Sequence, residues 1–165
     1  MRDHRDMWPF TRRTPEERRE DREMKRLDKE KELDERIAHR ARLGKAAAIS
    51  STTIVCHRDT WNFADSLATG NTTAVYRPPV KGEIQELPNG MREVRLSGPN
   101  LVALLILTRN KQRELFRTPA DIAISRRIYA AIAIVVDGVD VTSNSGAVPP
   151  IIIDAAPGRE PGDLG

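Results

Sequence analysis

The chain is poor in cysteine, aromatic residues and long apolar runs, and each shortage excludes a class of protein. Its 165 residues include one cysteine, Cys56, so an intramolecular disulfide and a multi-cysteine metal site are both excluded. With 3 Phe, 2 Trp and 2 Tyr, any core must be mainly aliphatic. The longest apolar run, residues 128–136, falls well short of the roughly 20 residues of a membrane span. The N-terminus also lacks the apolar core of a signal peptide, so we expect a cytoplasmic protein.

Sequence patterns for catalysis are equally scarce. The glycines are isolated rather than gathered in a phosphate-binding loop, and no His, Cys or Asp spacing fits a metal site. Cys56, His57 and Asp59 are the one cluster of catalytic residue types. Neighbouring residues of a strand point to opposite faces, so Cys56 and His57 would not form a nucleophile–base pair. We predict no enzymatic activity, no cofactor and no metal, and keep a small hydrolase centred on His57 as a third hypothesis.

Basic residues are concentrated in the first part of the chain. The formal net charge is +3 and the pI about 9.3. Residues 1–45 contain 15 Lys and Arg against 12 Asp and Glu, whereas residues 46–165 contain 12 of each. Arginine outnumbers lysine by 21 to 6, which is typical of a GC-rich coding sequence and favours a bacterial or phage origin.

Hydrophobic patterning and turn residues predict an α+β fold. We expect a long charged N-terminal helix, then a small domain with a β-hairpin and two C-terminal helices, and finally a disordered tail. The predicted boundaries are a disordered N-terminus at 1–13, a charged helical arm at 14–44, a small α+β domain at 46–142 and a flexible tail at 143–165. Within that tail, the apolar run 151–153 is a segment that could dock back on the domain.

The start of the arm is strongly marked. Thr14 and Glu17 are spaced as a capping box, and Pro15 suits the first helical position. No Pro or Gly follows until Gly44, which we interpret as the helix stop. The pattern therefore predicts one helix of about 29 residues, roughly 43 Å long.

The domain is less regular. Residues 49–57 and 72–77 favour strands, and residues 59–67 favour a short helix ended by Gly70. The Pro88-Asn89-Gly90 segment between two alternating runs predicts a hairpin. Trp61 and Phe63 are expected to anchor the core.

Two helices are predicted after the hairpin. The Leu-rich run 101–107 favours a buried helix. Thr118-Pro119 starts a second helix, expected to run to about Val136 with Gly138 as its stop. An alternative places residues 128–141 in a β-hairpin, because Ile and Val are frequent there and Asp-Gly favours a turn.

The arm separates its charges by sign. On a helical wheel with about 100° per residue, one face about 60° wide carries most of the basic side chains, and Arg19 and Arg26 extend this face to about 100°. Seven residues of this face are the ones that we expect to bind a partner. We call these residues the basic ridge: Arg18, Arg22, Lys25, Arg26, Lys29, Arg36 and Arg40. All ten acidic residues of the arm occupy the rest of the wheel, with Lys31 and Arg42 as basic exceptions there. Apolar residues form no continuous seam, which argues against a coiled coil.

Charge pairs within the arm are unfavourable on balance. Between residues 16 and 40, five i, i+4 pairs have opposite charges and eight have like charges. Each like pair destabilises an isolated helix by about 0.2–0.5 kcal/mol. We therefore expect an external partner. The sequence predicts an accessory or adaptor module whose arm docks electrostatically on a protein partner or on another copy. The alternative is a nucleic-acid-associated protein that uses the same ridge.

Overall fold

The computed structural model describes residues 14–69, 82–114, 118–140, 142 and 148–154. They belong to two units, residues 1–39 and residues 40–165. The disordered segment predicted for residues 1–13, the strand predicted for 72–77 and the helix stop at Gly70 lie outside the described residues.

Helix α1 covers Pro15–Ala48 and begins with the predicted capping box. The hydroxyl of Thr14 accepts a hydrogen bond from the Glu17 amide at 3.2 Å, and the Glu17 carboxylate accepts one from the Thr14 amide at 2.7 Å. The predicted stop at Gly44 is wrong. The next residues are Lys and three Ala, which are good helix formers, and Ala46 is fully buried in the core, so the helix continues for four residues beyond Gly44.

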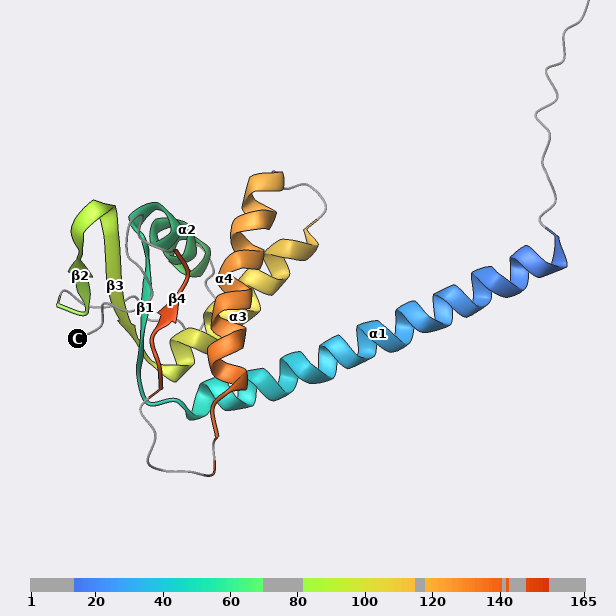
Figure 1. Cartoon of the computed structure of the whole chain (residues 1–165), viewed down its shortest axis with the longest axis horizontal. Helices are drawn as coiled ribbons and strands as arrows, with labels where there is room; N and C mark the ends of the chain where they lie inside the picture. Colours follow the sequence, from blue (N-terminus) through green and yellow to red (C-terminus); the bar gives the residue numbers. More distant parts are fainter. Residues whose placement is uncertain (1–13, 70–81, 115–117, 141, 143–147, 155–165) are drawn as a thin grey trace, which may run out of the picture. The chain divides into compact units, whose positions relative to one another are not determined.

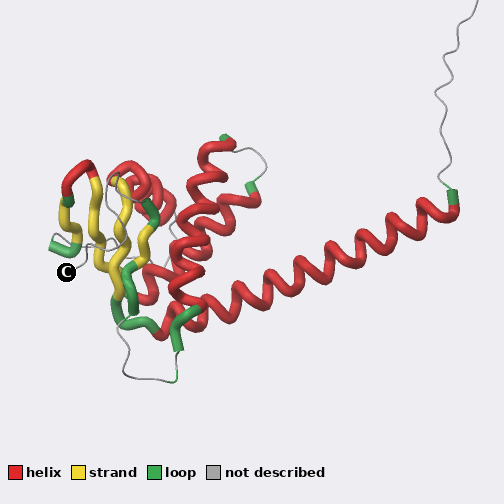
Figure 2. The backbone as a smooth tube through the Cα atoms, in the orientation of Figure 1, coloured by secondary structure: helices red, strands yellow, loops and turns green. Residues whose placement is uncertain are grey.

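Four strands form one mixed sheet: β1 (Thr52–His57), β2 (Ile84–Glu86), β3 (Met91–Leu96) and β4 (Ile151–Ile152) (Figures 1 and 2). The strand order is β2-β3-β1-β4, and only the β1–β4 pairing is parallel. The predicted hairpin between β2 and β3 is confirmed. Asn89 and Gly90 in its turn have φ values of 60° and 72°, the left-handed region that Asn and Gly adopt most readily.

Three helices complete the domain: α2 (Arg58–Thr69), α3 (Gly98–Arg113) and α4 (Pro119–Asp137). The α4 start is capped as the sequence indicates, because the Thr118 hydroxyl accepts a hydrogen bond from the Asp121 amide at 3.2 Å. The helix runs through Asp137, so the alternative β-hairpin at residues 128–141 is wrong. Five residues on one side of α4 are buried: Ser125, Ile128, Ile132, Ala133 and Val136. Their 3–4 residue spacing is that of a helix face rather than of a strand.

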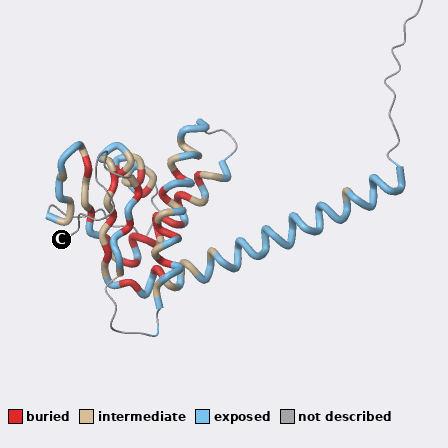
Figure 3. The backbone as a smooth tube through the Cα atoms, viewed as in Figure 1, coloured by how far each residue is buried: buried red, intermediate tan, exposed pale blue. Residues whose placement is uncertain are grey.

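The core lies between one sheet face and the helices (Figure 3). Burial alternates along β1, where Thr52, Ile54 and Cys56 are buried and the residues between them are half-buried. Trp61 is buried and Phe63 packs against the same cluster, which confirms both as core anchors. The remainder is aliphatic, with Leu, Ile and Val side chains from α3, α4 and β3 in contact.

Strand β4 brings residues expected in the flexible tail into the sheet. Ile151 and Ile153 are buried, and Ile152 between them is 58% exposed. The Ile153 amide donates to the Val55 carbonyl at 2.9 Å. The docking considered for this apolar run is thus confirmed, and the folded domain extends beyond residue 142. The tail residues 143–147 and 155–165 lie outside the described part of the chain.

Candidate partner-binding surface

The helical arm displays the whole basic ridge. In the structure, the seven predicted residues are all exposed on α1: Arg18, Arg22, Lys25, Arg26, Lys29, Arg36 and Arg40. Figure 3 shows exposed residues along nearly all of this helix before its C-terminal turns. Arg40 is the first residue of the second unit, and the other six belong to the first. The helix therefore presents these seven side chains to solvent at helical spacing.

Intrahelical ion pairs neutralise the ridge only in part. Arg36 donates to Glu32 at 2.8 Å, and Arg26 lies 3.8 Å from Glu30. The Arg22 side chain donates to a backbone carbonyl, that of Arg18, at 3.2 Å. Within the described ranges, four ridge cations have no ion-pair or hydrogen-bond partner for their charged groups: Arg18, Lys25, Lys29 and Arg40. The ridge consequently keeps cationic groups available for an anionic surface.

Four large apolar side chains are exposed on the arm. Met24 is 62% exposed, Leu27 49%, Leu33 57% and Ile37 60%. Met24 and Leu27 lie on the acidic side of the wheel, whereas Leu33 and Ile37 lie near the edge of the ridge. These side chains add apolar contact area beside the charged groups on both sides of the helix.

Arg42, a basic exception on the acidic side of the wheel, has a structural role that the sequence did not reveal. Its guanidinium donates to both oxygens of Asp137, one bond measuring 2.8 Å, and to the Tyr129 hydroxyl at 2.7 Å. The Lys45 ammonium donates to the Asp137 carbonyl at 2.6 Å, where it also meets the negative end of the α4 dipole. These bonds hold the last turns of α1 against α4.

The hydrogen bonds between Arg42 and Asp137 shift the pKa of both groups. The hydrogen bond to Asp137 raises the pKa of Arg42, against the smaller opposing effect of burial. The hydrogen bond from Arg42 holds the pKa of Asp137 below its usual value of 3.8. Both groups are therefore charged at neutral pH, and the pairing between residues 95 positions apart could not be read from local spacing.

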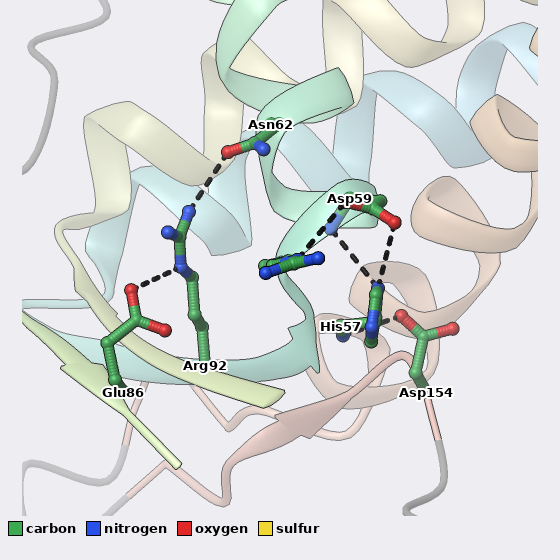
Figure 4. Close-up of polar contacts among 7 residues, drawn as sticks. His57, Asp59, Asn62, Glu86, Arg92 and Asp154 are labelled. Atoms are coloured by element: carbon green, nitrogen blue, oxygen red, sulfur yellow. Dashed lines mark hydrogen bonds and ion pairs between the residues drawn. The ribbon is translucent and has the colours of Figure 1, made fainter. Parts of the chain in front are cut away.

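The residues around His57 form a second polar cluster, at the end of β1 (Figure 4). His57 Nδ1 accepts from the Asp59 amide at 3.3 Å and lies 3.4 Å from the Asp59 carboxylate. The His57 amide donates to Asp154 at 2.9 Å, and Arg127 pairs with the same carboxylate at 3.0 Å. These contacts fasten the end of β4 to β1 and α4. His57 and Asp59 are close in the sequence, whereas Asp154 lies 97 positions from His57 and could not be linked to it from local spacing.

Arg92 in the same view links the hairpin to α2. Its guanidinium donates to Glu86 at 2.7 Å and to Asn62 at 2.9 Å.

Cys56 is fully buried, and burial raises the pKa of its thiol to about 12. Since the thiolate is the reactive form, this cysteine is an inert core residue at neutral pH.

No group of three or more His, Cys, Asp or Glu side chains in the described ranges could hold a metal ion. Of the helices in that part of the chain, none combines the length and apolarity needed to cross a bilayer.

The fold and this surface define a small α+β domain with a charged helical arm. No protein-family model matches the chain, and comparisons with curated proteins and with solved structures gave no match either. The function is therefore inferred from the residues themselves.

Proposed function

We propose that the protein is a non-enzymatic accessory or adaptor module, whose helical arm docks electrostatically on a protein partner or on another copy of the chain. The observation that carries this proposal is the exposed basic ridge, in which the charged groups of four residues have no partner in the described part of the chain: Arg18, Lys25, Lys29 and Arg40. The α+β domain then serves as the folded body that the arm connects to its partner.

Two properties of the arm favour a protein surface as the target. Like-charge i, i+4 pairs outnumber opposite ones by eight to five, and an acidic surface on the ridge would relieve the four basic pairs among them. Leu33 and Ile37 are more than half exposed near the edge of the ridge. An acidic protein surface with apolar side chains would cover both the ridge cations and these two apolar side chains, whereas a phosphate backbone would match only the cations.

The test is ridge-dependent capture of protein. A variant with Arg22→Glu, Lys25→Glu and Lys29→Glu reverses three ridge residues. The matched control, Lys31→Glu, Arg113→Glu and Arg126→Glu, changes the net charge equally at three exposed positions off the ridge. Each chain is immobilised and exposed to nuclease-treated cell extract at low and high salt.

The wild-type and control chains should retain the same proteins at low salt, and the ridge variant should lose them. Retention should fall at about 0.5 M salt, because exposed charges are screened over a few ångströms there. Equal retention by all three chains would rule out docking through the ridge.

Nucleic acid is the second candidate, favoured by the same free cations. If the ridge lies along duplex DNA, the affinity should fall with salt at a log–log slope of roughly −3 to −6, since each neutralised phosphate contributes about −0.9. The ridge variant should then lose binding to a duplex probe while the off-ridge control keeps it. If the chain binds neither duplex nor single-stranded probes, protein docking is the one proposed function that stands.

A further inference from the structure

We propose that the surface covering the basic ridge is an acidic stripe on the arm of a second copy of this chain. The stripe consists of five exposed carboxylates of α1: Glu16, Glu20, Glu23, Glu30 and Asp34. This inference rests on the proposed function and names its partner.

The two surfaces have the same repeat. Five ridge residues, Arg18, Arg22, Lys25, Lys29 and Arg36, follow one another at intervals of 4, 3, 4 and 7 residues. The acidic stripe has intervals of 4, 3, 7 and 4. Intervals of three and four that sum to seven describe the side of a helix that follows a neighbouring helix. Both stripes therefore suit a helix partner, and each has the charge that the other lacks.

Opposite charges meet at four positions along the contact. In an antiparallel alignment, four opposite-charge pairs form when the two residue numbers add up to 52. The pairs between copies are Arg18 with Asp34, Arg22 with Glu30, Lys29 with Glu23, and Arg36 with Glu16. A parallel alignment shifted by two residues also gives four.

The positions of the antiparallel alignment that have no opposite-charge pair are compatible with the contact. Lys25 falls opposite the exposed Leu27 of the second copy in the antiparallel alignment, where its aliphatic stem covers an apolar group. Like charges meet at two places: Glu32 lies opposite Glu20, and Arg26, which is 3.8 Å from Glu30 of its own helix, lies opposite Arg26 of the second copy. Glu32 is held by Arg36 of its own helix at 2.8 Å, which offsets the repulsion.

The contact between two copies does not produce a closed dimer. The two stripes lie about 140° apart on the helical wheel, so one pair of helices joins the ridge of one copy to the acidic stripe of the other. Each pair thus leaves one ridge and one acidic stripe uncovered. Such head-to-tail contacts add further copies, and the assembly should grow with concentration rather than stop at a dimer.

The test mixes two full-length variants with complementary changes. One carries Arg22→Glu, Lys25→Glu and Lys29→Glu, so two of the four pairs between its own copies, 22 with 30 and 29 with 23, become acidic like-charge pairs. The other carries Glu20→Lys, Glu23→Lys and Glu30→Lys, so the same two pairs become basic like-charge pairs, and mixing the two variants restores opposite charges at both. Molar mass is measured by light scattering at about 50 mM and about 500 mM salt, a range over which screening becomes strong. The off-ridge variant Lys31→Glu, Arg113→Glu, Arg126→Glu is the matched control.

We expect the wild type and the control to exceed the monomer mass at low salt, with a mass that rises with concentration and falls at high salt. Each stripe variant alone should be monomeric, and their equimolar mixture should associate. A cooperative thermal melt of each variant verifies that its domain is folded.

A monomeric wild type at low salt, or a mixture that stays monomeric, would overturn the inference. If the nuclease-treated extract still yields ridge-dependent capture of other proteins in that case, the proposed function stands without self-association. If that capture also fails, both the self-association and the proposed function are wrong.

Discussion

At the residue scale, Gly98 and Gly44 differ in how closely other backbone atoms approach them. A Cβ added to Gly98 would lie 2.5 Å from the Ala46 carbonyl oxygen and 3.1 Å from that of Ala47, both backbone atoms. The Gly98 amide also donates to the Ile49 carbonyl at 3.0 Å, so α3 begins in direct contact with the end of α1. Gly44, in contrast, has no atom within 4 Å of an added Cβ and lies inside a helix.

Alanine substitutions should therefore change stability in opposite directions. Gly98→Ala forces the backbones apart and should lower the free energy of unfolding by about 1–3 kcal/mol. Gly44→Ala should raise the stability of the helix by about 0.5–1 kcal/mol, because glycine is the more flexible residue in the unfolded chain. Urea unfolding followed by circular dichroism measures both. A Gly98→Ala protein as stable as the wild type would contradict the close approach.

Asp137 should make stability depend on pH. Its pKa is lower in the folded chain than the ordinary 3.8, so the Arg42 pair contributes stability above about pH 4. That contribution is lost as the pH falls through the lower, folded-state pKa. Asp137→Asn should cost no more than about 1 kcal/mol at pH 7, because the carboxylate is half exposed.

The difference between wild type and Asp137→Asn should shrink as the pH falls below about 4. Unfolding in urea at several pH values measures it. Asp28→Asn, an exposed change on the arm, is the control and should show no such trend. A difference that stays constant down to pH 2 would show that the ion pair does not stabilise the fold.

At the element scale, local signals predicted the starts of helices and the turn of the hairpin. Thr14 and Thr118 cap their helices through bonds between residues three apart, and Asn89 and Gly90 adopt the φ values that their turn requires. Such signals are visible in sequence because their partners are near neighbours. The end of α1 was missed because burial of Ala46 by distant residues extends the helix past Gly44. Strand β4 similarly depends on pairing with β1, about 100 residues earlier.

The isolated arm should be only partly helical. A peptide of residues 14–44 keeps the capping box but lacks the bonds of Lys45 and the burial of Ala46, and its like-charge pairs are unfavourable. Circular dichroism at low peptide concentration measures the helical fraction. Thr14→Ala should lower it further, since a cap contributes about 1 kcal/mol. Nearly complete helicity in dilute solution would mean that the arm needs no partner to be stable.

At the scale of the whole molecule, the folded body depends on residues that the sequence assigned to the arm. The second unit begins at Arg40, and it includes the Arg42 and Lys45 bonds to Asp137 as well as the half-buried Leu43. The charge separation of the ridge could be predicted, because the position of each side chain around the helix follows from helical spacing and its sign from the residue type. The boundary of the body was not, since it is set by contacts with α4.

Removal of residues 1–39 should therefore leave a cooperative thermal melt near that of the full chain. Removal of residues 1–44 also deletes Arg42 and Leu43 and should lower the melting temperature by several degrees, as expected for a loss of about 1–2 kcal/mol in a small domain. Differential scanning calorimetry of the two truncated chains measures the difference. Identical melts would place the boundary after Gly44 instead.

The central claim, that the basic ridge is the surface that meets a partner, is tested most directly by chemical labelling of three arm lysines. Lys25 and Lys29 belong to the ridge, Lys31 lies on the acidic side, and all three are exposed in the structure. The full-length chain in nuclease-treated extract is acetylated briefly, and labelling is measured by mass spectrometry. We predict that Lys25 and Lys29 react several-fold more slowly than Lys31 at low salt, and that the difference disappears at about 0.5 M salt as the charges are screened. Equal reactivity of the three lysines at low salt would contradict the claim.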